Sequence, residues 1–146
     1  MNTSSRSPGT RFRFEKLDIW PAARTLNVEI YRMTQQFPAA ESYGLTSQMR
    51  RASVSVSANI AECSGRNSDR DFAHFLEQAY ASAMELASHV FLAGDLGFVV
   101  SGPAESAVEK IHQLAMRIAA LNRSLKVKLS KVDLRPSTFD RRPSTA

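Results

Sequence analysis

Apolar residues recur every three or four positions over four stretches of the chain, which is the spacing of α-helices that each bury one face. The stretches are 17–37, 45–64, 69–96 and 103–125. Their apolar stripes, with one Asn, are Ile19, Ala22, Ala23, Leu26, Ile30, Met33, Phe37; Leu45, Met49, Ala52, Val56, Ile60, Cys63; Phe72, Phe75, Leu76, Ala79, Ala83, Leu86, Val90, Ala93; and Val108, Ile111, Ala115, Ile118, Asn122, Leu125. Four such helices with short connections predict an all-α, antiparallel up-down-up-down four-helix bundle.

Local signals mark the expected helix ends. Asp18 is expected to cap the first helix, and Pro38 to stop it. Ser68 is expected to cap the third helix, and Gly97 fits the residue just beyond its end. Pro103 is placed at the first position of the fourth helix, where its missing N–H costs little.

The segment 53–57, Ser-Val-Ser-Val-Ser, alternates polar and apolar residues like a half-buried strand. No other segment offers a strand partner, so we assign it to the helix 45–64 and interpret the alternation as a local accident of β-branched residues. Val54, Ala58 and Ala61 then form a second apolar face, opposite the core stripe. A helix that is apolar on two faces is usually buried on both, so we expect this face to lie in the interface of a homo-oligomer.

Two polar stripes run along neighbouring predicted helices, between the apolar faces. The first comprises Gln48, Arg51, Ser55, Asn59 and Glu62, and the second comprises Gln78, Ser82, Glu85 and His89. Stripes of this kind can satisfy each other across a helix contact, for example through an Arg51–Glu85 pair. Two interpretations stay open, a polar network that fixes helix register and a site for a ligand or partner.

The net charge of +5 is concentrated at the two ends of the sequence. Residues 1–14 hold three arginines and no acid, and residues 126–146 hold six bases against two acids, so the rest sums to −2. We expect flexible basic tails at 1–14 and 130–146 around a bundle domain at 15–129. Such tails are either merely solvated or bind RNA or DNA. The candidate nucleic-acid contacts are Arg50, Arg66, Arg70, Lys126, Lys128, Lys131, Arg135, Arg141 and Arg142, with Arg11 and Arg13 adding to them.

Catalytic chemistry has weak support in the sequence. The single cysteine, Cys63, lies on the predicted core face, and no Gly-rich phosphate loop or cysteine pair exists. One alternative is a metal-dependent enzyme of di-iron type, built from Glu109 and His112, Asp71 and His74, Glu29 and Glu62. His74 and Glu109 lie opposite the core stripes, so we expect no metal, no cofactor and no catalytic residue. The sequence has a single cysteine and no apolar leader or membrane span, so we expect a cytoplasmic protein. A transit peptide is the alternative for the start of the chain, which is rich in Arg and Ser and has no acid.

Several ordered motifs resemble the bacterial four helix bundle family, whose genes were noticed inside intervening sequences of large-subunit ribosomal RNA genes. The central motif comprises Phe37-Pro38, Gly44-Leu45, Gln48, Arg50-Arg51-Ala52, Ser55 and Asn59-Ile60-Ala61-Glu62. Flanking motifs are Phe14-Glu15, Leu17, Ile19-Trp20, then Phe75-Leu76, Ala79, Ser82, Glu85-Leu86 and Leu96-Gly97-Phe98. The resemblance covers about residues 14–125. Cys63 departs from it, because glycine is usual there.

The resemblance implies an up-down-up-down bundle that assembles as a ring, a pentamer. It implies no enzymatic activity. The accessory protein of diversity-generating retroelements is similar to this family, which suggests nucleic acid and a nucleic-acid-processing protein as partners. From the residues and the resemblance together, we expect a non-enzymatic, homo-oligomeric scaffold or adaptor.

Overall fold

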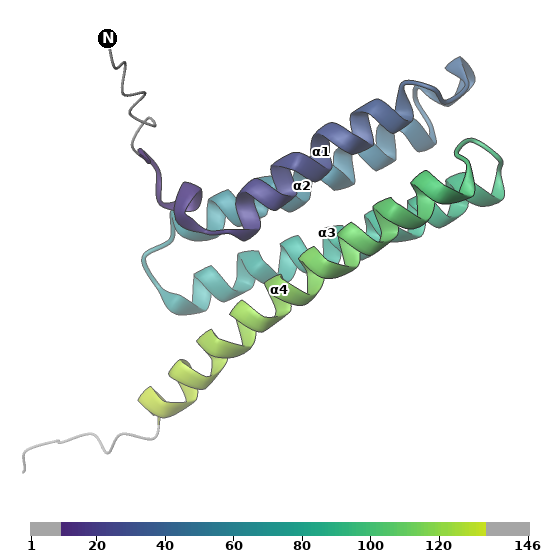
Figure 1. Cartoon of the computed structure of the whole chain (residues 1–146). Helices are drawn as coiled ribbons and strands as arrows, with labels where there is room; N and C mark the ends of the chain where they lie inside the picture. Colours follow the sequence, from purple (N-terminus) through teal and green to yellow (C-terminus); the bar gives the residue numbers. More distant parts are fainter. Residues whose placement is uncertain (1–9, 134–146) are drawn as a thin grey trace, which may run out of the picture.

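The structure is a computed structural model that describes residues 10–133 and forms a four-helix bundle (Figure 1). Its elements are η1 (Arg13–Lys16), α1 (Ile19–Thr34), η2 (Ala39–Glu41), α2 (Leu45–Ser64), α3 (Asp69–Asp95) and α4 (Ser101–Asp133). All regular elements within the described residues are helical. Helices adjacent in sequence run antiparallel. The α2–α3 contact is the most extensive, and the α3–α4 contact is the next. The predicted up-down-up-down bundle is confirmed.

The predicted apolar stripes form one continuous core. Ile30, Met49, Ile60, Leu86 and Ile118 are among its largest fully buried side chains, and they come from all four helices. Met33, Phe72, Phe75 and Val108 pack against the core while staying partly exposed. Segment 53–57 lies inside α2, as the helical interpretation predicted.

The helix ends of α3 follow the predicted local signals. Ser68 Oγ accepts a hydrogen bond from the Asp71 backbone N–H at 3.1 Å, which caps the first turn. At the other end Gly97 has a φ of 74°, in the left-handed region that glycine favours. The Phe98 N–H donates to the Ala93 carbonyl at 2.9 Å, and the Gly97 N–H to the Gly94 carbonyl at 3.0 Å. This bond pair is a Schellman motif, and it turns the chain directly into α4.

Three other helix ends differ from the predictions. Asp18 stands at the N-cap position of α1 but makes no capping bond; its carboxylate instead pairs with Arg117 at 2.9 Å. Helix α1 ends at Thr34, where a tight turn directs Phe37 into the core against Phe98, with ring centroids 5.6 Å apart. Helix α4 begins at Ser101, two residues before Pro103, which therefore lies inside its first turn.

The boundaries of the predicted tails also differ in part. Arg13 and Phe14 belong to η1 and not to a tail. The centroid of the Phe14 ring lies 4.6 Å from that of Trp20 in α1, so aromatic packing holds this basic segment against the bundle. Helix α4 continues to Asp133, beyond the predicted domain end at 129. Residues 1–9 and 134–146 of the predicted tails lie outside the described residues.

Candidate functional site

The predicted polar stripes of α2 and α3 meet along the contact between these helices. Arg51 Nη2 donates to Glu85 Oε1 at 2.5 Å and to Gln48 Oε1 at 2.7 Å. His89 Nε2 lies 3.4 Å from the same Glu85 oxygen, one helical turn along α3. The Arg51–Glu85 pair that the spacing predicted is present in the structure. Its side chains are 58% and 38% exposed, so solvent screens the pair.

The hydroxyl part of these stripes lies deeper between the two helices. Ser55 Oγ and Ser82 Oγ are 2.9 Å apart, which joins α2 to α3. Asn59 Nδ2 donates to the Ser55 carbonyl at 2.9 Å and to its hydroxyl at 3.1 Å. Glu62 turns away to Arg66, one turn further along the chain. Gln48, Arg51, Ser55, Asn59, Ser82, Glu85 and His89 therefore form polar contacts with other stripe residues within one chain.

A second polar contact, between α1 and α2, was missed by the sequence reasoning. Ser53 Oγ donates to Asn27 Oδ1 at 2.5 Å, and Asn27 Nδ2 donates to Ser57 Oγ at 2.7 Å. Ser53 and Ser57 are one turn apart, so they face α1 together, whereas Ser55 faces α3. The alternation of serines is therefore not a local accident, because it places a small hydrogen-bonding residue against each neighbouring helix.

Arg50 belongs to this same α1–α2 contact. Its Nε donates to Thr34 Oγ1 at 2.8 Å, and its guanidinium lies 4.6 Å from the ring centroid of Tyr31. Arg66 is similarly held, by Glu62 and over the Phe75 ring at 4.3 Å. Both arginines were candidate nucleic-acid contacts, and the structure engages both in contacts within the bundle.

The remaining basic candidates lie in the N-terminal segment, at the start of α3 and towards the C-terminal end of the chain. Arg11, Arg13 and Arg70 are exposed on the surface of the described region, as are Lys128 and Lys131. Lys126 Nζ lies 3.0 Å from Glu77 Oε1. The hydrogen bond from Lys126, together with one from Asn122, lowers the pKa of the Glu77 carboxyl. Arg135, Arg141 and Arg142 lie outside the described residues.

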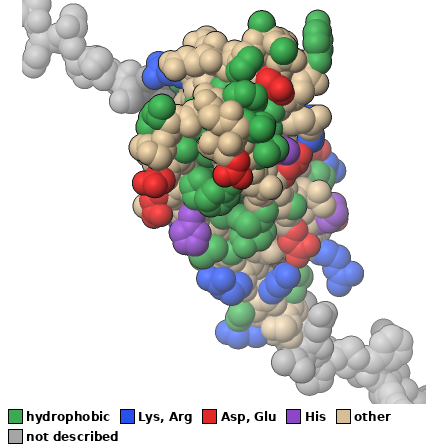
Figure 2. All heavy atoms as spheres, turned by 90° about the vertical axis from the view of Figure 1, so that its right-hand side faces the viewer, with side chains coloured by type: hydrophobic (Ala, Val, Ile, Leu, Met, Phe, Trp, Pro, Cys, Tyr) green, Lys and Arg blue, Asp and Glu red, His purple; other side chains and the backbone are tan. Residues whose placement is uncertain are grey.

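These bases give the molecule two unlike regions. Figure 2 views it from the end that carries the α3–α4 turn, where hydrophobic side chains gather with acidic ones among them. Lysine and arginine side chains concentrate towards the lower end of this view. The sequence of α4 explains the separation, because it contains no acid between Glu109 and Asp133 but six bases, Lys110, Arg117, Arg123, Lys126, Lys128 and Lys131.

The face of α2 proposed as an oligomer interface is only partly open in the single chain. Val54 is 43% exposed, and Ala58 is exposed one turn further on. Ala61 is half-buried, because it lines a shallow groove together with Arg11 and Phe14 of the N-terminal segment. Part of this face is therefore covered by the chain itself.

The carboxylate and histidine residues of the metal-enzyme alternative are not brought together. Glu29 accepts a hydrogen bond from Lys110 at 2.6 Å, and Glu62 pairs with Arg66. His74 is exposed. Across residues 10–133, no group of three or more His, Cys, Asp or Glu side chains is arranged to hold a metal ion.

Cys63 is fully buried in the core, and its thiol donates to the Ile60 carbonyl. Burial raises the pKa of the Cys63 thiol to about 12. A thiol with this pKa stays protonated at neutral pH, and only the thiolate is an effective nucleophile. Cys63 therefore serves as a small residue of the hydrophobic core.

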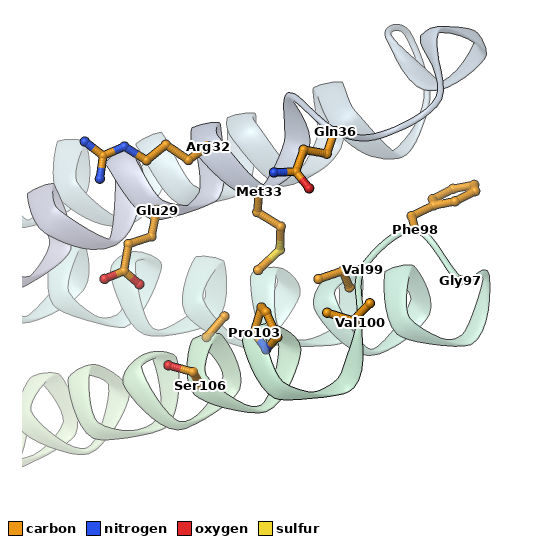
Figure 3. A pocket seen from close by; sticks show the side chains of 11 residues that line it. Glu29, Arg32, Met33, Gln36, Gly97, Phe98, Val99, Val100, Pro103 and Ser106 are labelled. Atoms are coloured by element: carbon orange, nitrogen blue, oxygen red, sulfur yellow. The ribbon is translucent and has the colours of Figure 1, made fainter.

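The contact between α1 and α4 is the least extensive of the helix pairs. A groove of about 390 Å³ opens there, beside the α3–α4 turn (Figure 3). Met33 points from α1 towards Pro103 of α4, while Glu29 and Arg32 stand along the α1 side. Two ion pairs bridge the rest of this contact, Glu29–Lys110 at 2.6 Å and Asp18–Arg117 at 2.9 Å.

No helix of the described chain is both long and apolar enough to cross a bilayer.

Comparison with known proteins identifies relatives of this fold. Residues 15–125 match a family described as 23S rRNA-intervening sequence protein. A crystal structure of a protein of unknown function from the S23 ribosomal protein family of Bacteroides thetaiotaomicron superposes with a TM-score of 0.68 at 18% identity. The match covers 72% of this chain and 95% of that one. No curated protein matches the chain.

Proposed function

The chain belongs to the 23S rRNA-intervening sequence protein family, and on that premise we propose that it is a non-enzymatic, homo-oligomeric adaptor that binds nucleic acid through the basic end of α4. The name of the family gives no reaction, and the similar solved structure is that of a protein of unknown function. The function therefore has to be argued from the surfaces of this chain.

The observation that carries the proposal is the acid-free, basic stretch of α4 between Glu109 and Asp133. Three of its bases are neutralised by partners on other helices, namely Lys110, Arg117 and Lys126. Arg123, Lys128 and Lys131 are exposed, and no acidic side chain of residues 10–131 forms an ion pair with them. The sequence continues with Arg135, Arg141 and Arg142. Positive charge thus accumulates beyond the point where the other helices can neutralise it.

A surface of this kind suits a phosphate backbone better than it suits a small anion. Exposed lysine and arginine bind phosphates mainly by releasing condensed counterions, which makes the affinity depend steeply on salt and little on sequence. Several copies in one oligomer would present several such surfaces, and weak contacts add up when they act together.

The structure narrows the predicted set of contacts. Arg50 and Arg66 are held by Thr34, Tyr31, Glu62 and Phe75, so moving them to a phosphate would break existing contacts. We therefore leave both out of the proposed interface. Arg70 stays in it, because it is exposed at the start of α3.

The exposed apolar face of α2 supports the homo-oligomeric part of the proposal. Val54 is 43% exposed, and Ala58 is exposed one turn further along α2. Apolar surface of this kind is stabilised when a second copy removes it from water. The buried, protonated thiol of Cys63 and the scattered carboxylates support the non-enzymatic part.

The test is a salt titration of RNA and DNA binding with the full chain. The double variant Lys128→Glu, Lys131→Glu should weaken binding and make the slope of log affinity against log salt shallower by about 1.4–1.8. A matched double variant, Arg24→Glu, Arg32→Glu, changes the net charge equally on exposed positions of α1. It should keep most of the wild-type slope.

Two outcomes would contradict the proposal. The first is a wild-type protein that binds neither RNA nor DNA at low salt. The second is equal loss of binding in both double variants, because net charge alone would then explain the effect. Light scattering on each variant must show the wild-type assembly, so that a loss of binding cannot arise from a changed oligomer.

A further inference from the structure

A second groove, of about 410 Å³, lies between the last turns of α3 and the first turns of α4. We name it the acidic groove. Its floor includes Val90, Phe91, Val99, Ala104 and Val108, and its acidic side chains are Asp95, Glu105 and Glu109. The groove therefore combines an apolar floor with a carboxylate rim.

The apolar part of this region is unusually open to solvent. Phe91 is 62% exposed, and the neighbouring Leu96 and Val100 are 52% and 71% exposed. Figure 2 shows hydrophobic side chains gathered at this end of the molecule. Exposed apolar side chains that lie together in this way are typical of a binding site, and here they favour a partner that contributes an apolar side chain of its own.

The rim of the groove is negatively charged. Asp95, Glu105 and Glu109 make no ion pair within residues 10–133. Asp95 also stands in the last turn of α3, where no base offsets the negative end of the helix dipole. An occupant with positive charge beside an apolar side chain would match both properties of the groove.

A segment of this chain has that composition. Residues 134–146 contain Leu134 and Phe139, together with Arg135, Arg141 and Arg142 against the single acid Asp140. Residues 1–9 have one arginine and no large apolar side chain except Met1, so they match the groove less well.

Phe139 cannot reach the acidic groove of its own chain. Along α4, Glu109 lies 24 residues before Asp133, which at 1.5 Å per residue is about 36 Å. Phe139 follows Asp133 by six residues and can extend at most about 22 Å beyond it. The groove that receives Phe139 must therefore belong to a second copy.

We propose that residues 134–146 of one copy occupy the acidic groove of another, with Phe139 on the apolar floor and the arginines against Asp95, Glu105 and Glu109. Each copy then donates one segment and receives one, which is satisfied both by a reciprocal dimer and by a head-to-tail ring. This inference rests on the proposed function in requiring that copies meet, and it uses a surface different from the α2 face. An occupied groove withdraws Arg135, Arg141 and Arg142 from the nucleic-acid interface, which then consists of the exposed bases of α4.

The experiment is a mixed cross-linking assay with two full-length variants. One chain carries Thr138→Cys, which keeps the adjacent Phe139, and the other carries Ala104→Cys, which replaces a small groove residue. The native Cys63 is buried and its thiol is protonated, so it does not compete. Mild oxidation at low salt should give a disulfide between residues 138 and 104 of different chains, identified by mass spectrometry.

Two control variants sharpen this result. Replacing Ala104→Cys by Thr25→Cys, at an exposed position on α1, should give at least tenfold less cross-link. Adding Glu105→Lys and Glu109→Lys to the groove chain should reduce the cross-link by a similar factor, because the rim then repels the arginines.

Absence of the 138–104 cross-link would overturn the proposal, and so would equal cross-linking to the Thr25→Cys chain. Protection of the Ala104→Cys thiol from alkylation without a cross-link would place a different occupant in the groove and also overturn it. Light scattering on the same samples reports the homo-oligomer separately, so the assembly in the proposed function can stand while this inference fails.

Discussion

Removing the Asn27 side chain tests whether the α1–α2 contact depends on its hydrogen bonds. Asn27 links Ser53 and Ser57 of α2, and Ser53 is only 1% exposed. In Asn27→Ala the buried Ser53 hydroxyl loses its acceptor, which costs about 1–3 kcal/mol. The better helix propensity of Ala offsets about 0.5 kcal/mol of this. We expect a net loss of about 1–2 kcal/mol in the free energy of unfolding, or about 4–8 °C in Tm.

The assay is urea unfolding followed by helical circular dichroism, at one fixed protein concentration because an oligomer's stability depends on concentration. Arg51→Met is the comparison, since it removes the exposed Arg51–Glu85 pair. Such a pair contributes at most about 1 kcal/mol, so Arg51→Met should be the less destabilised variant.

A double-mutant cycle separates the hydrogen bond from other effects of the substitution. Ser53→Ala in the Asn27→Ala background removes the unsatisfied hydroxyl and should recover about 1 kcal/mol, because losing both partners costs less than losing one. If the double variant shows no recovery, or if Arg51→Met is the more damaging change, the argument that the buried α1–α2 bonds outweigh the exposed α2–α3 pair is refuted.

Three further predictions concern other parts of the bundle. Ala58→Glu should put an unpaired charge into the α2 interface and shift the assembly towards monomer in light scattering, whereas Ala81→Glu, exposed on α3, should not; a monomeric wild type would exclude this interface. Gly97→Ala should destabilise by about 1–2 kcal/mol because its φ is 74°, while Gly94→Ala, with nothing within 4 Å of the added Cβ, should stabilise slightly; similar effects at both positions would refute the strain argument. Burial raises the pKa of the Cys63 thiol to about 12, above the pKa of about 8.5 of a thiol in the unfolded chain. The free energy of unfolding, relative to that of Cys63→Ala, should therefore be constant below this unfolded-state pKa and should fall as the pH rises above it. A difference between the two proteins that does not change with pH in urea titrations would contradict this.

The fold could be predicted from the sequence because its core repeats at the helical period. Ile30, Met49, Leu86 and Ile118 are each part of a stripe several turns long, so no single residue decided the assignment. The Arg51–Glu85 pair was predictable for the same reason, since both residues stand in polar stripes of matching spacing.

The helix ends and the α1–α2 contact were less predictable, because each depends on one or two residues. Asn27 stands in no polar stripe of α1, so its own position in the sequence does not predict a contact with α2. Thr34 ends α1 before Pro38 because of a turn that only the core position of Phe37 explains. The serine spacing of α2, with 53 and 57 one turn apart, was the available signal for the missed contact.

The bundle is bonded unevenly around its circumference, and this has a consequence for folding. Each helix packs closely on its sequence neighbour, and such local contacts form early. Only the α1–α4 contact closes the cylinder, and its Glu29–Lys110 pair joins residues 81 positions apart. Closing so long a loop is entropically expensive, and few side chains compensate for it there. We therefore expect α1 and α4 to meet last as the chain folds and to separate first under heat or force, leaving α2 and α3 as the most persistent hairpin.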